Sequence, residues 1–294
     1  MLVPIADLSV IFLTYDEPKK EEFWVRLKNI APWASRVDGV NGSDAAHKAA
    51  AAASETDRFI LIDGDNIPDA DFFDQSLILE PATNDCVFRW RARNHINGLV
   101  YGNGGISCWT RTFVNNMRTH EASNGDAESN VEFCFDPKYI ALHNCYSTTY
   151  PNGSEFHAWR AGFREGVKMT LDRGTRISLQ AFEKKVHSGN YRNLCTWHSV
   201  GADIEYGRAA MDGAKLGTYL TMCTEWDYTE VQSFDALATL WNNRLNYNMD
   251  EIALILQKKL SLPIAQLSPD ASKFFKYYAL HTHQNREIML KAFQ

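Results

Sequence analysis

Two aspartates, Asp63 and Asp65, stand one residue apart directly after the apolar run 59–62. A strand that ends in this way places two hard oxygen ligands at the carboxyl edge of a sheet. Mg²⁺ and Mn²⁺ prefer such ligands and can bridge protein carboxylates to a diphosphate. The alternative is an ordinary turn, because the dipeptide Asp63-Gly64 is a strong turn signal. We expect a divalent-metal site with Asp65 as the first ligand, and Asp63 as a second ligand or a contact to a ribose.

A second group of polar side chains lies on a predicted helix that begins near residue 155. Ser154 can cap this helix, and the N-terminus of a helix favours phosphate. His157, Arg160 and Arg164 share one face of the helix, because they are spaced by three and four residues. The arrangement indicates a phosphate contact by the two arginines. The alternative is an amphipathic surface helix with solvated arginines.

The elements that must position these residues alternate along the first 65 residues. Apolar runs at 8–14 and 58–62 and a second short segment at 36–40 predict strands, and the segments 21–30 and 43–53 predict helices between them. This order predicts an α/β fold with a doubly wound, mostly parallel sheet, in which ligands bind at the carboxyl ends of strands. The polar segments 14–17, 38–42 and 63–65 would meet at that edge.

The character of the chain changes after the third strand. A short helix is expected at 69–77 and a strand at 86–93, where Arg89, Arg91 and Arg93 alternate with apolar residues. Strands at 99–102 and 106–109 flank a glycine turn, a helix follows at 112–118, and the pattern beyond residue 172 is mainly helical. We therefore expect a catalytic domain at 1–195 and a helical C-terminal extension at 196–294.

Composition limits the functional classes. The 294 residues are 45% hydrophobic, which is enough for a substantial core, and the net charge is −6. No overall positive field attracts nucleic acid or an anionic membrane, so a nucleic-acid partner would need a local basic patch. The longest apolar runs are strand-sized, and no basic segment precedes the first of them. We expect a cytoplasmic protein without a membrane partner, and the sequence does not predict its oligomeric state.

The order and spacing of these motifs resemble the GT-A class of glycosyltransferases over roughly residues 8–170. This resemblance implies a metal-dependent transferase that uses a nucleoside diphosphate sugar, most simply a UDP-sugar, with Mn²⁺ or Mg²⁺ as the cofactor. The matching residues are Thr14-Tyr15-Asp16-Glu17-Pro18 after the first strand, Asp38 after the second, Asp63-Gly64-Asp65 after the third, and Gly104-Gly105-Ile106-Ser107 downstream.

The resemblance also suggests roles on the donor side. Thr14 belongs to the matching loop, Tyr15 can stack on the base, Asp16 can contact the ribose, and Asp38 can accept from the uracil ring. Enzymes of this class often add a distal histidine ligand to the metal, for which His157 is the best placed here. Arg160 and Arg164 would contact the donor diphosphate. The other histidines considered as ligands are His143, His187 and His198, the last being the first alternative.

On the acceptor side, Gly104 and Gly105 remove side chains where a ligand approaches, and Trp109 can provide a platform for a sugar. Core packing is the alternative role for Trp109. A transferase that inverts the anomeric centre needs a carboxylate base, for which Glu121 and Glu132 lie in the expected window, while a retaining enzyme needs none.

The segment 150–168 resembles part of phage-encoded glycosyltransferases, some of which add glucose or arabinose to hydroxylated pyrimidines in phage DNA. This resemblance implies a DNA acceptor and a protein that works in the host cytoplasm. A transferase that builds a bacterial surface glycan and a non-catalytic module that binds sugar nucleotides or DNA are the alternatives. A nucleotidyltransferase also fits paired carboxylates, but the segment 14–18 has no phosphate-binding glycine.

Overall fold

The computed structural model describes residues 1–102, 105–117, 119 and 138–279, and the chain divides into two compact units. The first unit contains the described residues up to His95 and those from Val100 to Gly153. The second contains Ile96–Leu99 and the described residues from Ser154 onwards. The main boundary therefore lies about forty residues before the expected position at 195, because the helix that begins at Glu155 packs with the later helices.

A mixed sheet forms the centre of the first unit. Its strands follow the order β3-β2-β4-β9-β7-β10-β5, with β8 on the side of β7. Strand β9 is antiparallel to both of its neighbours, β4 and β7, and β5 is antiparallel to β10, so the other five strands on this path share one direction. The strands are β2 (Ser9–Thr14), β3 (Ser35–Asp38), β4 (Arg58–Asp63), β5 (Asn66–Pro68), β7 (Val87–Asn94), β8 (Val100–Tyr101), β9 (Ile106–Thr110) and β10 (Tyr139–Thr149).

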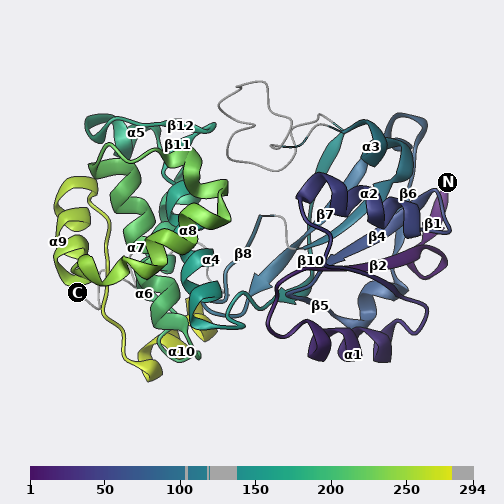
Figure 1. Ribbon diagram of the computed structural model, residues 1–294, viewed down its shortest axis with the longest axis horizontal. Coiled ribbons are helices and arrows are strands. Elements are labelled where there is room, and N and C mark those ends of the chain that lie inside the picture. Colours follow the sequence, from purple (N-terminus) through teal and green to yellow (C-terminus); the bar gives the residue numbers. More distant parts are fainter. Residues whose placement is uncertain (103–104, 118, 120–137, 280–294) are drawn as a thin grey trace. The chain divides into compact units, whose positions relative to one another are not determined.

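Helices cover both faces of this sheet, as Figure 1 shows. Because side chains alternate along a strand, Phe12 of β2 stacks on Trp24 of α1 on one face, and Ile11 shares a core cluster with Ala50 of α2 on the other. The doubly wound arrangement expected from the sequence is therefore present. The covering helices are α1 (Lys20–Ile30), α2 (Ser43–Ala53) and α3 (Arg111–Asn116).

The prediction of a helix at 69–77 is wrong. This segment forms a 3₁₀ turn, η2 (Ala70–Asp74), and then the short strand β6 (Ser76–Ile78), which pairs with β1 (Leu2–Pro4). Phe72 and Phe73 of η2 are buried in the core on the α1 side of the sheet, so packing decides the local conformation here. The remaining short elements of this unit are η1 (Ile5–Asp7) and η3 (Pro81–Thr83).

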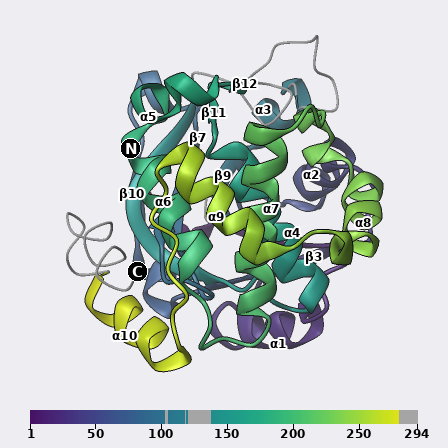
Figure 2. The same ribbon diagram turned by 90° about the vertical axis from the view of Figure 1, so that its left-hand side faces the viewer.

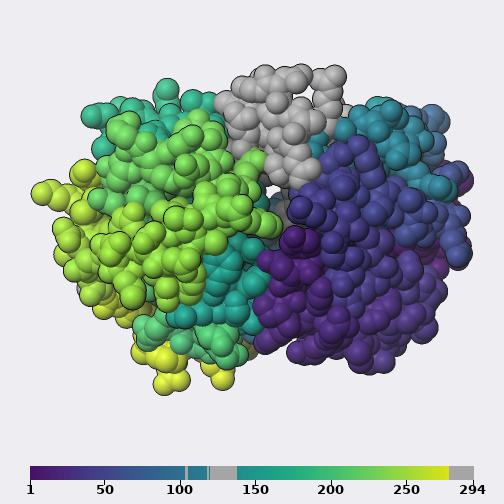
Figure 3. All heavy atoms as spheres, viewed as in Figure 1, coloured from purple at the N-terminus to yellow at the C-terminus, as the bar shows by residue number. Residues whose placement is uncertain are grey.

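The second unit is mainly helical, as expected for the C-terminal part of the chain. In Figure 2, α9 lies in front of α7, with which it packs, and Figure 3 shows that the visible face of this unit comes from the teal-to-yellow part of the chain. Its elements are α4 (Glu155–Lys168), β11 (Leu171–Asp172), β12 (Thr175–Arg176), η5 (Leu179–Ala181), α5 (Phe182–Lys185), α6 (Ser188–Ser199), α7 (Gly207–Cys223), η6 (Tyr228–Gln232), α8 (Phe234–Asn242), η7 (Arg244–Asn246), α9 (Met249–Leu260) and α10 (Pro269–Ala279).

Helices α4 and α7 pack backbone against backbone. A Cβ atom added at Gly162 of α4 would lie 1.9 Å from the carbonyl oxygen of Ala210 in α7. In return, a Cβ at Gly213 of α7 would lie 2.1 Å from the carbonyl oxygen of Trp159 in α4. Only glycine leaves room for this mutual approach, which holds α4 firmly within the second unit.

The short segment Ile96–Leu99 also belongs to the second unit, although it follows β7 of the first. The Ile96 side chain is fully buried, and its carbonyl oxygen accepts a hydrogen bond from Nζ of Lys276 in α10 at 3.3 Å. Lys276 also forms an ion pair with Asp203 at 2.5 Å. A strand connection of the first unit thus supplies part of the interior of the second.

Candidate functional site

The two aspartates lie at the carboxyl end of β4, where the chain turns towards β5. The amide nitrogen of Asp63 donates to the carbonyl oxygen of Gly105 at 2.8 Å, next to β9. The carbonyl oxygen of Asp65 accepts from the amide nitrogen of Tyr150 at 2.7 Å. Both backbone positions are therefore fixed by neighbouring parts of the first unit.

Two glycines make room for the polar side chains around this turn. Gly105 has a φ of 72°, and a Cβ added there would lie 3.1 Å from Oδ2 of Asp63 and 2.7 Å from Nδ2 of Asn66. A Cβ at Gly64 would lie 2.7 Å from Oε2 of Glu17. The side chains of Asp63, Asn66 and Glu17 thus lie directly against glycine backbone, and Gly105 lies beside Asp63.

Glu17 is a member of this group to which the sequence alone assigned no role. Its Oε2 atom accepts from the amide nitrogen of Tyr15 at 2.7 Å, which folds the loop after β2 back towards Gly64. The signal in the sequence was its place in the same polar loop as Thr14 and Asp16. Its pairing with the turn after β4 depends on β2 and β4 being neighbours.

The carboxylates influence each other's charge. The pKa of Asp63 is raised from 3.8 to about 8, by desolvation first and then by the negative charges of Asp65 and Glu17. The Asp63 side chain is exposed to solvent, which limits the contribution of desolvation. The negative charges of Asp65 and Glu17 are therefore the better-supported cause of the raised pKa. Negative charge gathered in this way favours a bound cation.

The described residues contain no group of three or more histidine, cysteine, aspartate or glutamate side chains placed to hold a metal ion. The aspartates of the first unit therefore provide an incomplete ligand set. The remaining positions of a bound ion would be filled by water or by phosphate oxygens, which is usual for Mg²⁺ in nucleotide sites.

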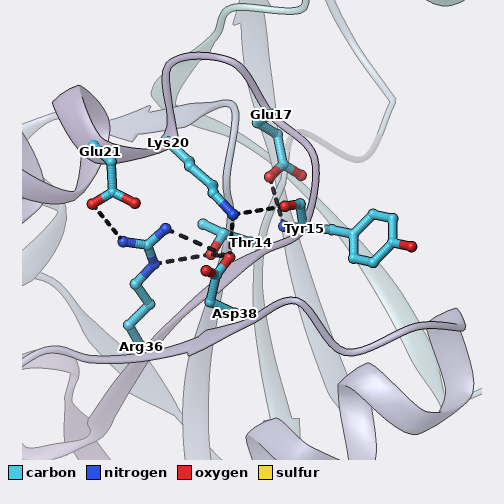
Figure 4. Close-up of polar contacts among 7 residues, drawn as sticks. All are labelled: Thr14, Tyr15, Glu17, Lys20, Glu21, Arg36 and Asp38. Carbon is cyan, nitrogen blue, oxygen red and sulfur yellow. Dashed lines mark hydrogen bonds and ion pairs between the residues drawn. The ribbon is translucent and has the colours of Figure 1, made fainter.

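A polar network lies at the ends of β2 and β3, and Figure 4 shows it in full. Thr14 Oγ1 donates to Oδ1 of Asp38 at 2.6 Å and accepts from Nε of Arg36 at 2.9 Å. Nζ of Lys20 donates to Oδ1 of Asp38 at 2.7 Å and to the carbonyl oxygen of Tyr15 at 2.7 Å. The hydrogen bonds from Lys20 and then Thr14 lower the pKa of Asp38, which keeps it ionised.

The accessible groups of this network are those expected to meet a nucleotide. The ring of Tyr15 is 43% exposed and points away from the network in Figure 4, so one of its faces can stack on a base. Asp16 is exposed beside it. Asp38 uses Oδ1 for all of its contacts with Thr14, Lys20 and Arg36, which leaves Oδ2 without a partner among the described residues.

The network and the aspartates approach the sheet edge from opposite faces. Thr14 is in register with Asp38, and Leu13 is in register with Asp63. Because successive side chains alternate, Thr14 and Asp38 project towards the α1 face, and Asp63 projects towards the face covered by α2. A ligand that touches both groups must therefore lie over the end of β2 and β4.

Trp109 does not provide a sugar platform. Its side chain is 1% exposed and lies in the core beside α2 and α3, where it contacts the rings of His47, Phe113 and Tyr139. Core packing, the alternative for this residue, is what the structure shows. Three other predicted residues lie outside the described part of the chain, and they are Gly104, Glu121 and Glu132.

The residues predicted on the helix after Ser154 belong to the second unit. Ser154 caps α4 as expected, and its Oγ accepts from the amide nitrogen of His157 at 3.2 Å and meets Nδ1 of the same residue at 2.7 Å. The guanidinium of Arg160 lies over the rings of Phe156 and Phe234, at 5.4 and 4.6 Å from their centroids. Arg164 follows one turn later and is half-buried. The expected ligand set of Asp63, Asp65 and His157 is thus divided between two units.

The other histidines have structural partners. His198, the alternative ligand, is fully buried in α6, and its Nε2 meets Oγ1 of Thr218 at 3.0 Å. Desolvation and then the charge of Lys215 lower its pKa to about 3. His187 caps α6 by accepting from the amide nitrogen of Gly189 at 3.2 Å. Neither His198 nor His187 is placed as a metal ligand.

No protein-family model, no curated protein and no solved structure matches this chain. Among the described helices, none combines the length and the apolar character needed to cross a bilayer.

Proposed function

We propose that this protein is a metal-dependent glycosyltransferase with a GT-A-like catalytic unit, which moves a glucose-like or arabinose-like sugar from a UDP-sugar to a hydroxylated pyrimidine base in phage DNA. The observation that carries the proposal is the placement of Asp63 and Asp65 at the carboxyl end of β4, beside Gly105 and next to the end of β2. The acceptor rests on the resemblance of the segment 150–168 to phage transferases.

The residues at the edge suit Mn²⁺ or Mg²⁺. Asp63 and Asp65 supply hard oxygen donors. The pKa of Asp63 is raised by desolvation and by the charges of Asp65 and Glu17, and a bound cation would reduce this repulsion between the carboxylates. When bound, such an ion neutralises the charge that develops on a diphosphate leaving group.

Side chains of the first unit would bind and orient the nucleotide. Tyr15 would stack on the uracil ring, and the Oδ2 atom of Asp38 would accept from the ring N–H while its Oδ1 is held by Thr14 and Lys20. Gly105 would let the sugar approach the aspartates closely. In an inverting reaction, Glu121 or Glu132 would take the proton from the acceptor hydroxyl.

Donor binding tests the proposal directly. A thermal-shift screen of UDP-sugars with Mn²⁺ should show a rise in the melting temperature for one donor, because selective binding stabilises the folded state. The Asp65→Ala variant should lose this metal-dependent shift and all transfer activity while it remains folded. The matched control, Asp71→Ala, removes an exposed carboxylate from η2 and should keep both. Full activity in Asp65→Ala would refute the metal assignment.

A further inference from the structure

Three arginines on β7 have no carboxylate partner among the residues that the structure describes. Arg89, Arg91 and Arg93 alternate along the strand, so their side chains leave it on the same side, and none forms an ion pair with a described residue. The guanidinium of Arg89 lies 4.3 Å from the centroid of the Tyr139 ring, and Nη2 of Arg91 meets Nδ1 of His143 at 2.8 Å. Among the described residues, Arg89 and Arg91 thus contact an aromatic ring and an imidazole, and neither partner is a carboxylate.

The row becomes more accessible towards the carboxyl end of β7. Arg89 and Arg91 are half-buried, and Arg93 is exposed. Desolvation and the charge of Asp71 raise the pKa of Asp69. The charge of Arg93 acts in the opposite direction and lowers this pKa, although the two residues form no ion pair. In a chain with a net charge of −6, three arginines on one strand are a local basic surface of the kind that a polyanion requires.

Strand register places this row beside the candidate site. Strand β9 lies between β4 and β7, and its pairings align residues of the three strands in rows across the sheet. One such row is Leu61–Ser107–Arg89. Strands β4 and β7 run in the same direction, so Asp63 and Arg91 each lie two residues further towards the same edge of the sheet, and the two strands are about 10 Å apart.

We propose that Arg89, Arg91 and Arg93 bind successive phosphodiester groups of the nucleic-acid strand that carries the acceptor base. This inference rests on the proposed function and assigns the surface on which the acceptor lies. Alternate residues of a strand are about 6.6 Å apart, so the row spans about 13 Å. A single diphosphate cannot meet all three side chains, whereas the repeated phosphates of a polynucleotide can. Backbone contacts of this kind fix the position of a nucleic acid and leave base recognition to other groups.

The test compares two charge-matched double variants. Arg91→Gln/Arg93→Gln removes the accessible part of the row and leaves Arg89 in place, since its packing on Tyr139 contributes to the fold. Arg192→Gln/Arg208→Gln removes the same charge from α6 and α7 of the second unit, where these arginines form no ion pair with described residues. The melting temperature of each variant, measured by circular dichroism, verifies folding.

Binding is measured by the fluorescence anisotropy of a labelled single-stranded oligodeoxynucleotide at several salt concentrations. We expect the β7 variant to bind about tenfold or more weakly at low salt, with a salt-dependence slope smaller by about 1.4, because each phosphate contact to a single strand contributes about 0.7. The control variant should match the unaltered protein. Equal losses in both variants, or no binding by the unaltered protein, would overturn the proposal.

Binding of UDP with Mn²⁺ forms the second arm of the experiment. The β7 variant should bind UDP as the unaltered protein does, because the row is assigned to the acceptor. Loss of UDP binding with unchanged DNA binding would assign the arginines to the donor and overturn the inference. If no UDP-sugar binds to the unaltered protein while the DNA result holds, the proposed transferase activity fails and the arginine row remains a nucleic-acid surface.

Discussion

Both units depend on glycine at a close approach, but the atoms that use the space differ. In the first unit, Gly64 and Gly105 face the ends of polar side chains, including the carboxylate of Asp63. In the second unit, Gly162 and Gly213 face backbone carbonyl oxygens of the opposite helix. A side chain can rotate away from an added methyl group, and a helix backbone cannot. The same type of residue therefore makes room for polar side chains in one unit and for backbone packing in the other.

The two regions also hold titratable groups whose protonation acts on stability in opposite directions. Burial lowers the pKa of His198 to about 3, so the folded second unit resists protonation in acid. The pKa of Asp63 is raised to about 8, by desolvation and then by Asp65 and Glu17, so the folded first unit resists ionisation near neutral pH. A fall in pH should therefore lower the stability of the helical unit, through His198, and raise the stability of the sheet edge, through Asp63.

The largest expected effect comes from a pair of Gly→Ala variants. Gly213→Ala places a methyl group 2.1 Å from the carbonyl oxygen of Trp159, so α4 and α7 must separate, at a cost of about 3 kcal/mol in the free energy of unfolding. Gly64→Ala meets the flexible carboxylate of Glu17 at 2.7 Å and the Cγ2 atom of buried Thr14 at 2.8 Å, so it should cost less than Gly213→Ala, about 1 kcal/mol, while it weakens donor binding. Urea unfolding measures both. If Gly213→Ala proves as stable as the unaltered protein, the distinction between the units is lost.

A smaller effect is expected from His198 in acid. Its pKa falls from 6.5 in the unfolded chain to about 3 in the folded one, so below pH 6.5 the unfolded state binds a proton that the folded state does not. Stability should therefore decrease as the pH falls from about 6.5 to 3. His198→Gln should flatten this dependence, while the exposed control His143→Gln should leave it unchanged. Melting temperatures measured across this pH range test the assignment of the pH dependence to His198. The assignment would be contradicted if the melting temperature of His198→Gln fell with pH as steeply as that of the unaltered protein.

The smallest effect is expected from Asp63, because solvent reaches its side chain and screens the charges that raise its pKa, whereas His198 is fully buried. Because its pKa rises from 3.8 to about 8 on folding, the folded state keeps a proton that the unfolded state loses, and stability should decrease as the pH rises between these values. Without divalent ions, Asp63→Asn should melt at a higher temperature than the unaltered protein at pH 8 and at the same temperature below pH 4. Mn²⁺ should stabilise only the unaltered protein. A lower melting temperature for Asp63→Asn at pH 8 would contradict the like-charge repulsion at the edge.

Several elements that carry candidate residues were predictable because their patterns are local. Strand β4 follows from four consecutive apolar residues, the helix α2 from its alanines, and the cap at Ser154 from its position before Glu155. Each pattern is set by neighbours within a few residues, so no knowledge of the fold was needed.

The features that escaped prediction depend on partners far away in the chain. Glu17 meets Gly64 only because β2 and β4 are adjacent, and the glycines of α4 have a purpose only against α7. Phe72 and Phe73 are buried by the sheet, which turns an expected helix into η2. The expected boundary at 195 misplaced α4 for the same reason, since its packing partner begins only at Gly207.

The segment Ile96–Leu99 has a consequence for synthesis on the ribosome. It leaves the exit tunnel long before α10, whose Lys276 binds the carbonyl oxygen of Ile96. Chains begin to fold from the N-terminus as they emerge, so the sheet of the first unit can form while the apolar side chains of Ile96 and Leu99 still await their partners. The nascent chain therefore exposes an apolar loop at least until Gly201, which lies beside the Ile96 side chain, has been translated, and a chaperone would bind the loop in that interval.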